Sequence, residues 1–201
     1  VGRSVPALEE RVFSVIPDNF AGGKKATQHL ISQGHRRIGM VKSMPEKYCS
    51  ALRDRVRGYC AALSEAGVPI DERLIVECPP PHFPLVGKKL LSEADPPTAV
   101  VVDNDVTLVR FIEFAQSIGV RIPGDLSVTG FDDLPQLRTP IPHTTIRAPH
   151  YEIGRMAATQ LMAAIQDPGT PPQHTIAPVE LVIRDTTGVN PRIMQASSAA
   201  G

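Results

Sequence analysis

The stretch Ala-Val-Val-Val-Asp-Asn-Asp, residues 99–105, decides the fold class of this 201-residue chain. Its four leading apolar residues include three valines and predict a short buried strand at Ala99–Val102. The apolar residues of Val106–Ile118 then recur at helical spacing, so a helix is expected directly after the polar turn. Apolar strands alternating with helices are typical of parallel sheets covered on both faces. The stretch therefore predicts an α/β fold.

The same alternation extends from this stretch in both directions. Short apolar segments predict further strands at Val12–Ile16, Ile38–Val41, Leu74–Glu77 and Leu126–Thr129. Apolar spacing and helix-ending glycines predict helices at residues 20–34, Ala51–Ala66 and Pro84–Ala94. This order predicts a doubly wound parallel sheet with helices on both faces.

The pattern changes after Gly130. Three prolines between residues 135 and 142 break any helix, and Thr144–Ile146 is expected to be at most a short edge strand. A last amphipathic helix is expected at Tyr151–Ile165 and a final strand at Val179–Ile183. The tail from Gly188 has little apolar content and is expected to be disordered.

Composition and charge exclude several classes of protein. With 42% hydrophobic and 21% charged residues, the chain is typical of a globular protein. Its formal net charge of 0 gives no sign of a nucleic-acid-binding domain, and no apolar run approaches the roughly 20 residues of a membrane span. Three cysteines without CxxC spacing, and no export signal at the first residues, predict free thiols and a cytoplasmic location.

Motifs for phosphate, metal and nucleophilic chemistry are incomplete. Gly22-Gly23-Lys24-Lys25 resembles a phosphate loop only superficially, because Asp18 stands where that loop needs a glycine and Lys25 where it needs serine or threonine. We interpret these glycines as a helix start that packs closely on its neighbour. No GxSxG elbow is present, and the histidines and cysteines lack metal-ligand spacing. We therefore expect neither a cofactor nor a metal.

Paired carboxylates follow two of the predicted strands. Asp103 with Asp105, and Asp132 with Asp133, stand at strand ends, where open α/β sheets bind their ligands. Such aspartates also cap helices, and Asp105 is expected to do so. Asp132 precedes no obvious helix, so its carboxylate is expected to face the crevice.

Arg55 is the candidate cation. Together with Arg53 and Arg57 it crowds the start of the helix Ala51–Ala66, where the helix dipole disfavours positive charge. A solvated basic face is one explanation. Arg55 is close to the apolar stripe, however, and is expected to donate to a hydroxyl or carboxylate in the crevice. On this hypothesis Arg55→Ala abolishes or severely weakens ligand binding and leaves folding nearly intact.

Taken together, these residues resemble the ligand-binding region of the lactose/galactose-repressor (LacI/GalR) family of bacterial transcription regulators. The resemblance runs from about Val12 to Thr187. It rests on the order and spacing of Asp18-Asn19, Gly34-His35-Arg36-Arg37-Ile38, Arg55 through Gly58-Tyr59, Asn104-Asp105, Gly119–Pro123 with Asp125, Gly130-Phe131-Asp132-Asp133, Thr144-Thr145, Ile153-Gly154 and Leu181–Arg184.

The resemblance implies a type I periplasmic-binding-protein-like fold, in which a small effector, usually sugar-like or nucleoside-like, lies between two subdomains. It implies that Arg55, Asn104 and Asp132 reach the ligand, and that His150 lines the site nearby. A sugar or related polyol suits such a set, because its hydroxyls both donate and accept. The family's stacking aromatic has no clear counterpart, although Phe83 could substitute for it.

Topology predicts that Arg55, Asn104 and Asp132 form one polar cluster. The predicted strands before Asn104 and Asp132 are successive and parallel, so their following loops leave the same edge of the sheet. The helix that carries Arg55 starts from that edge too. We expect the arginine to favour the ionised form of Asp132.

The resemblance also implies a division of the chain. Residues 18–147 and the final strand at 179–187 form the effector-binding subdomain, whereas residues 1–17 and the crossover and helix at 148–178 belong to the first subdomain, and 188–201 form a tail. The family's helix-turn-helix headpiece has no counterpart here, so we expect a C-terminal fragment or truncated product that does not itself contact operator DNA. The intact protein is expected to be a homodimer, and the helix Tyr151–Ile165 to leave an apolar patch.

Two other functions stay open at this point. A periplasmic sugar-binding protein of an ABC transporter has the same fold but needs a signal peptide. A nucleotide-dependent α/β enzyme is disfavoured because the GxGxxG, P-loop and nucleophile-elbow motifs are absent. We expect the effector-sensing part of a repressor, without catalysis.

Overall fold

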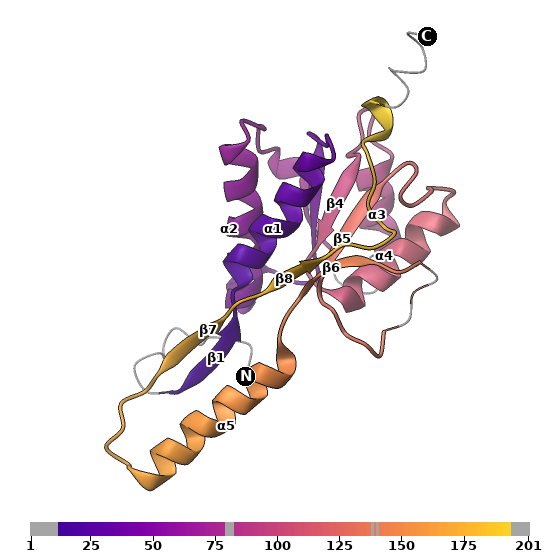
Figure 1. Cartoon of the computed structure of the whole chain (residues 1–201). Helices are drawn as coiled ribbons and strands as arrows, with labels where there is room; N and C mark the ends of the chain where they lie inside the picture. Colours follow the sequence, from indigo (N-terminus) through magenta and orange to yellow (C-terminus); the bar gives the residue numbers. More distant parts are fainter. Residues whose placement is uncertain (1–11, 79–82, 138, 140, 194–201) are drawn as a thin grey trace.

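The computed structural model describes residues 12–78, 83–137, 139 and 141–193, and within these ranges the strands form two sheets (Figure 1). The larger sheet has six strands in the order β3-β2-β4-β5-β6-β8. In that order the strands are Ile75–Glu77, Ile38–Lys42, Ala99–Val102, Ser127–Asp132, Thr144–Arg147 and Glu180–Val182. Neighbouring strands are parallel except β8, which is antiparallel to β6. The predicted doubly wound sheet is confirmed.

Helices cover both faces of this sheet. α1 (Asn19–Ser32) and α2 (Ser50–Glu65) lie on one face, and α3 (Phe83–Leu91) and α4 (Asp105–Ser117) on the other (Figure 1). The alternation of side chains along β4 explains this arrangement. Ala99 and Val101 pack with residues of α1 and α2, whereas Val100 and Val102 pack with residues of α3 and α4.

Two glycines bring α1 and α2 into backbone contact. A Cβ atom at Gly23 would lie 2.1 Å from the backbone oxygen of Arg55, and one at Gly58 would lie 2.1 Å from that of Phe20. Only glycine fits at such distances. The interpretation of Gly23 as a residue that packs closely on a neighbouring helix is confirmed.

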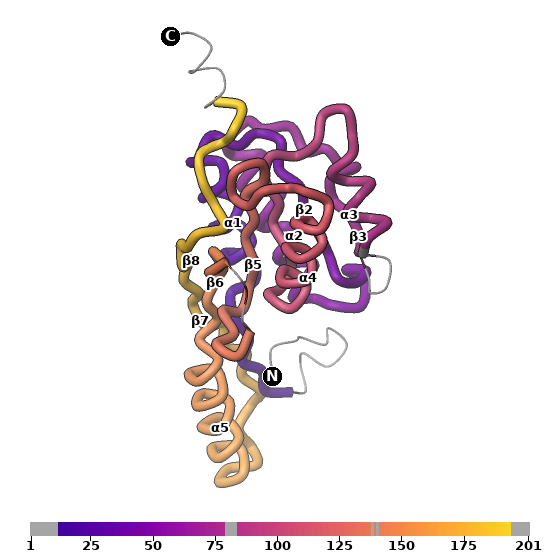
Figure 2. The backbone as a smooth tube through the Cα atoms, turned by 90° about the vertical axis from the view of Figure 1, so that its right-hand side faces the viewer, coloured from indigo at the N-terminus to yellow at the C-terminus, as the bar shows by residue number. Residues whose placement is uncertain are grey.

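The smaller sheet joins segments about 160 residues apart in the chain. β1 (Ser14–Pro17) pairs in parallel with β7 (His174–Ala177), and α5 (His150–Gln166) packs on them through Ile153. Figures 1 and 2 both show these three elements projecting from the six-stranded sheet. β7 is not predicted by the sequence, since its four residues show no clear alternation and its stability comes from pairing with β1.

Two expectations about the end of the chain are wrong. β6 is an interior strand between β5 and β8, because Glu180–Val182 adds to its free edge. The chain from Gly188 to Ile193 is folded, since Asn190 donates from Nδ2 to the backbone oxygen of Gly34 at 3.0 Å. Hydrogen bonds hold this segment in place although its apolar content is low. Residues 194–201 lie outside the described ranges.

All three cysteines, Cys49, Cys60 and Cys78, are free thiols, as expected. No helix in the described parts of the chain combines the length and apolar character that a membrane crossing requires.

Candidate functional site

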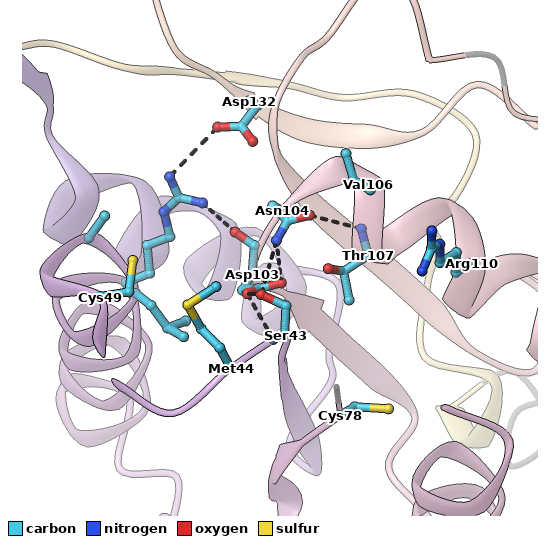
Figure 3. Close-up of a pocket in the computed structure, with 13 residues that line it drawn as sticks. Ser43, Met44, Cys49, Cys78, Asp103, Asn104, Val106, Thr107, Arg110 and Asp132 are labelled. Atoms are coloured by element: carbon cyan, nitrogen blue, oxygen red, sulfur yellow. Dashed lines mark hydrogen bonds and ion pairs between the residues drawn. The ribbon is translucent and has the colours of Figure 1, made fainter. Parts of the chain in front are cut away.

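A cavity of about 490 Å³ opens at the carboxyl ends of β2 and β4 (Figure 3). After β2 the chain passes outward to β3 and then returns to the other side of β2 as β4, so the strand order reverses here. Open α/β sheets bind ligands at such a reversal. The described residues that line the cavity are Ser43, Met44, Cys49, Ala51, Leu52, Arg55, Cys78, Asp103, Asn104, Val106, Thr107, Arg110 and Asp132.

Arg55 reaches the cavity from α2 and is held on several sides. Its Nε donates to Oδ1 of Asn19 at 2.9 Å, and Nη1 donates to the backbone oxygen of Asp103. The guanidinium carbon lies 3.5 Å from the ring centroid of Phe131, so the group also stacks on an aromatic face. Burial lowers the pKa of Arg55, and the nearby Asp132 and Asp103 carboxylates oppose that effect. These contacts fix the direction of the guanidinium.

Asp103 and Asn104 form a second fixed group with Ser43. The Asp103 carboxylate accepts from the backbone nitrogen of Ser43 at 2.9 Å and from its hydroxyl, and it also accepts from Nδ2 of Asn104 at 2.9 Å. Burial raises the pKa of Asp103, and the hydrogen bonds from Ser43 oppose this rise. Since Asp103 already accepts from several donors, it serves mainly to orient Asn104 and Ser43.

Asp132 is the carboxylate with free acceptor positions. Its Oδ1 lies 3.6 Å from Nη2 of Arg55, an ion pair longer than a hydrogen bond (Figure 3). Burial raises the pKa of Asp132 to about 6, and the charge of Arg55 offsets this only in part. Arg55 lowers the pKa of Asp132 and so favours its ionised form, as expected, but desolvation has the larger effect and raises the pKa overall.

The backbone at this loop is unusual. Asp132 has φ of 112° and Asp133 has φ of 55°, in the region that favours glycine. Asp133 is anchored by two arginines, since it accepts from Arg147 and from Arg184 at 2.7 Å each. This anchoring holds the strained loop in place and directs Asp132 towards the cavity.

The structure brings together three of the four residues expected at the site. Arg55, Asn104 and Asp132 all line the cavity. His150 does not line it; its Nε2 lies 3.1 Å from the backbone oxygen of Asp132, so this histidine contacts the loop and not the cavity. The side chain of Phe83, the possible stacking residue, lies outside the described part of the chain.

The expected role of Asp105 is wrong. Asn104 caps α4 by accepting from the backbone nitrogen of Thr107 at 2.8 Å. Asp105 is the first residue of the helix and is fully buried, where it accepts from the Thr145 hydroxyl at 2.7 Å and pairs with His143 at 3.2 Å. Both residue types cap helices, and only tertiary contacts decide which one does.

Sequence reasoning missed Ser43 and Arg110. Ser43 follows β2 directly, so the rule that ligands bind at strand ends would have found it. Arg110 lies one helical turn beyond Val106 and carries no local signal of its position. Among the described residues, no group of three or more histidine, cysteine, aspartate or glutamate side chains could hold a metal ion.

The comparisons with known proteins agree on one family. Residues 27–187 match the family described as periplasmic binding protein-like domain. The ribose operon repressor of Haemophilus influenzae is 34% identical over 179 residues, which are 86% of this chain and 52% of the relative. The transcriptional repressor CytR of Escherichia coli is 35% identical over 181 residues, which are 87% of this chain and 51% of the relative. The chain thus spans about half the length of the curated relatives that it matches.

Solved structures agree with the sequence relatives. The regulator CelR in complex with cellobiose matches with a TM-score of 0.82 at 30% identity, over 92% of this chain and 57% of that one. A LacI-family regulator from Enterococcus faecium with bound ribose matches with a TM-score of 0.77 at 27% identity, over 88% and 66%. The family match, the similar proteins and the order of the strands in the sheet all indicate the same family. The chain therefore belongs to the periplasmic binding protein-like domain family, and it is similar to the corresponding region of LacI-type transcriptional regulators.

Proposed function

We propose that this chain senses a small sugar-like polyol and that the ligand binds in the cavity between α2 and α4. The observation that carries the proposal is the pairing of Asp132, whose carboxylate has free acceptor positions, with the fixed donor Arg55 in one cavity. Hydroxyl groups donate to the carboxylate and accept from the guanidinium, so vicinal hydroxyls suit both. The bound ribose and cellobiose of two similar regulators support this ligand class.

Each residue has a distinct part in binding. Asp132 accepts from ligand hydroxyls, and Arg55 orients them. Asn104 uses Oδ1 to cap α4 and Nδ2 to contact Asp103, so it acts mainly by fixing the wall of the cavity. Met44, Leu52 and Val106 supply apolar surface for the ring carbons. None of these roles involves bond making, and we propose a binding function without catalysis.

The whole protein is proposed to act as a DNA-binding repressor in the cytoplasm, and as a homodimer. Residues 18–147 and 179–187 are proposed to form the effector-binding subdomain. The elements β1, α5 and β7 are proposed to belong to the other subdomain, on the opposite side of the effector. Their separate core of Val15, Ile153 and Ala177 supports this division.

The test is a titration-calorimetry screen of this chain against a panel of neutral and charged polyols. We expect at least one member to bind with one-to-one stoichiometry, and Asp132→Asn to weaken it by about 10- to 100-fold, since a hydrogen bond to a charged group contributes about 1.5–3 kcal/mol. If the nucleotides ATP and NAD bind in place of every polyol, the proposal is wrong.

Effector affinity is expected to fall as the pH drops through about 6. The free protein holds a proton on Asp132 below its pKa of about 6. Ligand hydroxyls favour the ionised carboxylate, so binding lowers that pKa and affinity decreases by up to about tenfold per pH unit below it. Calorimetry from pH 4.5 to 8 measures this. The Asp132→Asn variant removes the titrating group and is expected to show a flat profile; a sloped profile in that variant would assign the effect to another residue.

The raised pKa of Asp132 also predicts how the stability of the chain changes with pH. The direction is opposite to that expected for a carboxylate whose pKa is lowered by a salt bridge. The folded-state pKa is raised above the ordinary 3.8, so the folded chain binds more protons than the unfolded chain between these values. The contribution of Asp132 to stability is therefore present below about pH 4 and is lost as the pH rises through about 6.

Self-association of this chain is also expected. α5 leaves Tyr151, Leu161 and Ile165 at 81%, 60% and 62% exposure, and Ile176 of β7 is similarly exposed at 63%. Such an apolar surface favours association. Sedimentation velocity is expected to show concentration-dependent species above the monomer, and Leu161→Glu with Ile165→Glu to remove them. A monomer at all concentrations, without binding of a dye for apolar surfaces, would contradict this.

A further inference from the structure

The cavity contains a second arginine that the contacts proposed above do not use. Arg110 lines it from α4, and Figure 3 shows it beyond Thr107 on the same helix. Val106 and Arg110 are four residues apart, so they share one face of α4. Arg110 therefore extends the wall that begins at Asn104.

The charges of the cavity are paired unequally. Four of the described lining residues are charged, namely Arg55, Arg110, Asp103 and Asp132. Arg55 is bound to Asn19, to the Asp103 backbone and to Asp132, whereas Asp103 is bound to Ser43 and Asn104. Within the described contacts, no hydrogen bond or ion pair joins Arg110 to another side chain. Arg110 is thus a lining guanidinium without a described partner.

We propose that Arg110 binds an anionic group of the effector, so that the effector is a polyol that carries one phosphate or carboxylate. This inference rests on the proposed function and names the ligand class within it. A guanidinium binds both anions through two parallel N–H donors, and it does so better than a lysine.

The position of Asp132 sets the orientation of such a ligand. A carboxylate repels a second anion, and Asp132 is the acceptor for hydroxyls. The hydroxyl-bearing end of the ligand therefore lies at Asp132 and Arg55, and the anionic end at Arg110. Asp132 and Arg110 thus give the cavity a negatively charged side and a positively charged side. A neutral sugar would have no group that pairs with the charge of Arg110.

The experiment compares matched neutral and charged sugars by titration calorimetry on the whole chain. The pairs are ribose with ribose 5-phosphate, glucose with glucose 6-phosphate, and glucose with glucuronate. We expect a charged member to bind about 10- to 100-fold more tightly than its neutral partner, because it gains a pair of charge-assisted hydrogen bonds with Arg110. Arg110→Gln is expected to remove that advantage and to leave the affinity for the neutral partner unchanged.

Arg53→Gln is the matched control, because Arg53 is also an exposed helical arginine and does not line the cavity. It is expected to change neither affinity. Arg110→Lys is expected to restore only part of the advantage, since lysine keeps the charge and loses the fork. The pair that shows the larger difference identifies the anion as phosphate or carboxylate.

The outcomes separate this inference from the proposed function. A neutral sugar that binds as tightly as its charged partner, with no effect of Arg110→Gln on either, overturns the anionic effector and leaves the polyol function intact. Loss of both affinities equally in Arg110→Gln also overturns it, because the residue then acts on the fold. If no polyol binds at all, the proposed function and this inference are both wrong.

Discussion

Replacement of Arg55 by alanine is expected to lower effector affinity by about 100-fold or more, because truncating one partner of a buried charge pair costs about 2–5 kcal/mol in binding. Arg55 has only 12% of its side chain exposed and contacts Asp132, Asn19 and Phe131. The variant loses the ligand donor and also frees Asp132 to move. Titration calorimetry with a polyol that binds the unsubstituted chain measures the loss, and an unchanged affinity would remove Arg55 from the site.

The structure changes the expected effect of this variant on folding. The sequence suggests that folding stays nearly intact, but Arg55 is a donor to Asn19 and to the Asp103 backbone in a buried environment. Loss of these partners is expected to lower the free energy of unfolding by about 2 kcal/mol. Arg57→Ala is the matched control, since Arg57 is exposed on the same helix. It is expected to alter neither binding nor stability, and Arg55→Lys separates the lost fork from the lost charge.

Replacement of Gly58 by alanine is expected to lower the free energy of unfolding by about 3 kcal/mol, at the upper end of the range for overpacking. The new Cβ would lie 2.1 Å from the backbone oxygen of Phe20 and 2.7 Å from the backbone nitrogen of Lys24. Neither backbone atom can move without separating α1 from α2. Because α2 carries Arg55, ligand affinity is expected to fall as well. Denaturant unfolding monitored by circular dichroism measures the stability change.

Gly154→Ala makes the same chemical change where space is open. Gly154 lies in α5, and a Cβ there has no neighbour within 4 Å. Alanine in a helix interior is more stable than glycine by about 0.5–1 kcal/mol, so this variant is expected to be neutral or slightly stabilised. Equal destabilisation of both variants would show that the close helix contact is not the cause.

The strand ends show how much of the site can be predicted from sequence. Ala99–Val102 is a strand and Asp103-Asn104 follows it, so the parallel-sheet rule places Asn104 at the ligand edge. The same rule places Asp132 there. The prediction of Arg55 as a site residue needed a further argument. Three arginines crowd the start of α2, and only the position of Arg55 beside the apolar stripe distinguishes it from the other two. His150 came from the family resemblance alone, and it lies against the Asp132 backbone outside the cavity lining.

The pKa of Asp132 illustrates what could not be predicted. The sequence places a cation near the carboxylate, and that favours the ionised form. Burial has the opposite effect and is larger, so the pKa rises to about 6. Desolvation depends on every atom packed around a group, and no local pattern in the chain contains that information.

The sequence by itself determined the elements that depend on neighbouring residues, namely the alternating strands and helices of the six-stranded sheet and the convergence of Arg55, Asn104 and Asp132 at one edge. Tertiary structure alone decided which residue caps α4, the interior place of β6, and the folded path of Gly188–Ile193. It also decided the pairing of β1 with β7. The physical reason is the distance along the chain over which each interaction acts. Periodicity and capping preferences act over a few residues, whereas strand partners, buried hydrogen bonds and desolvation depend on segments that meet only in the folded chain.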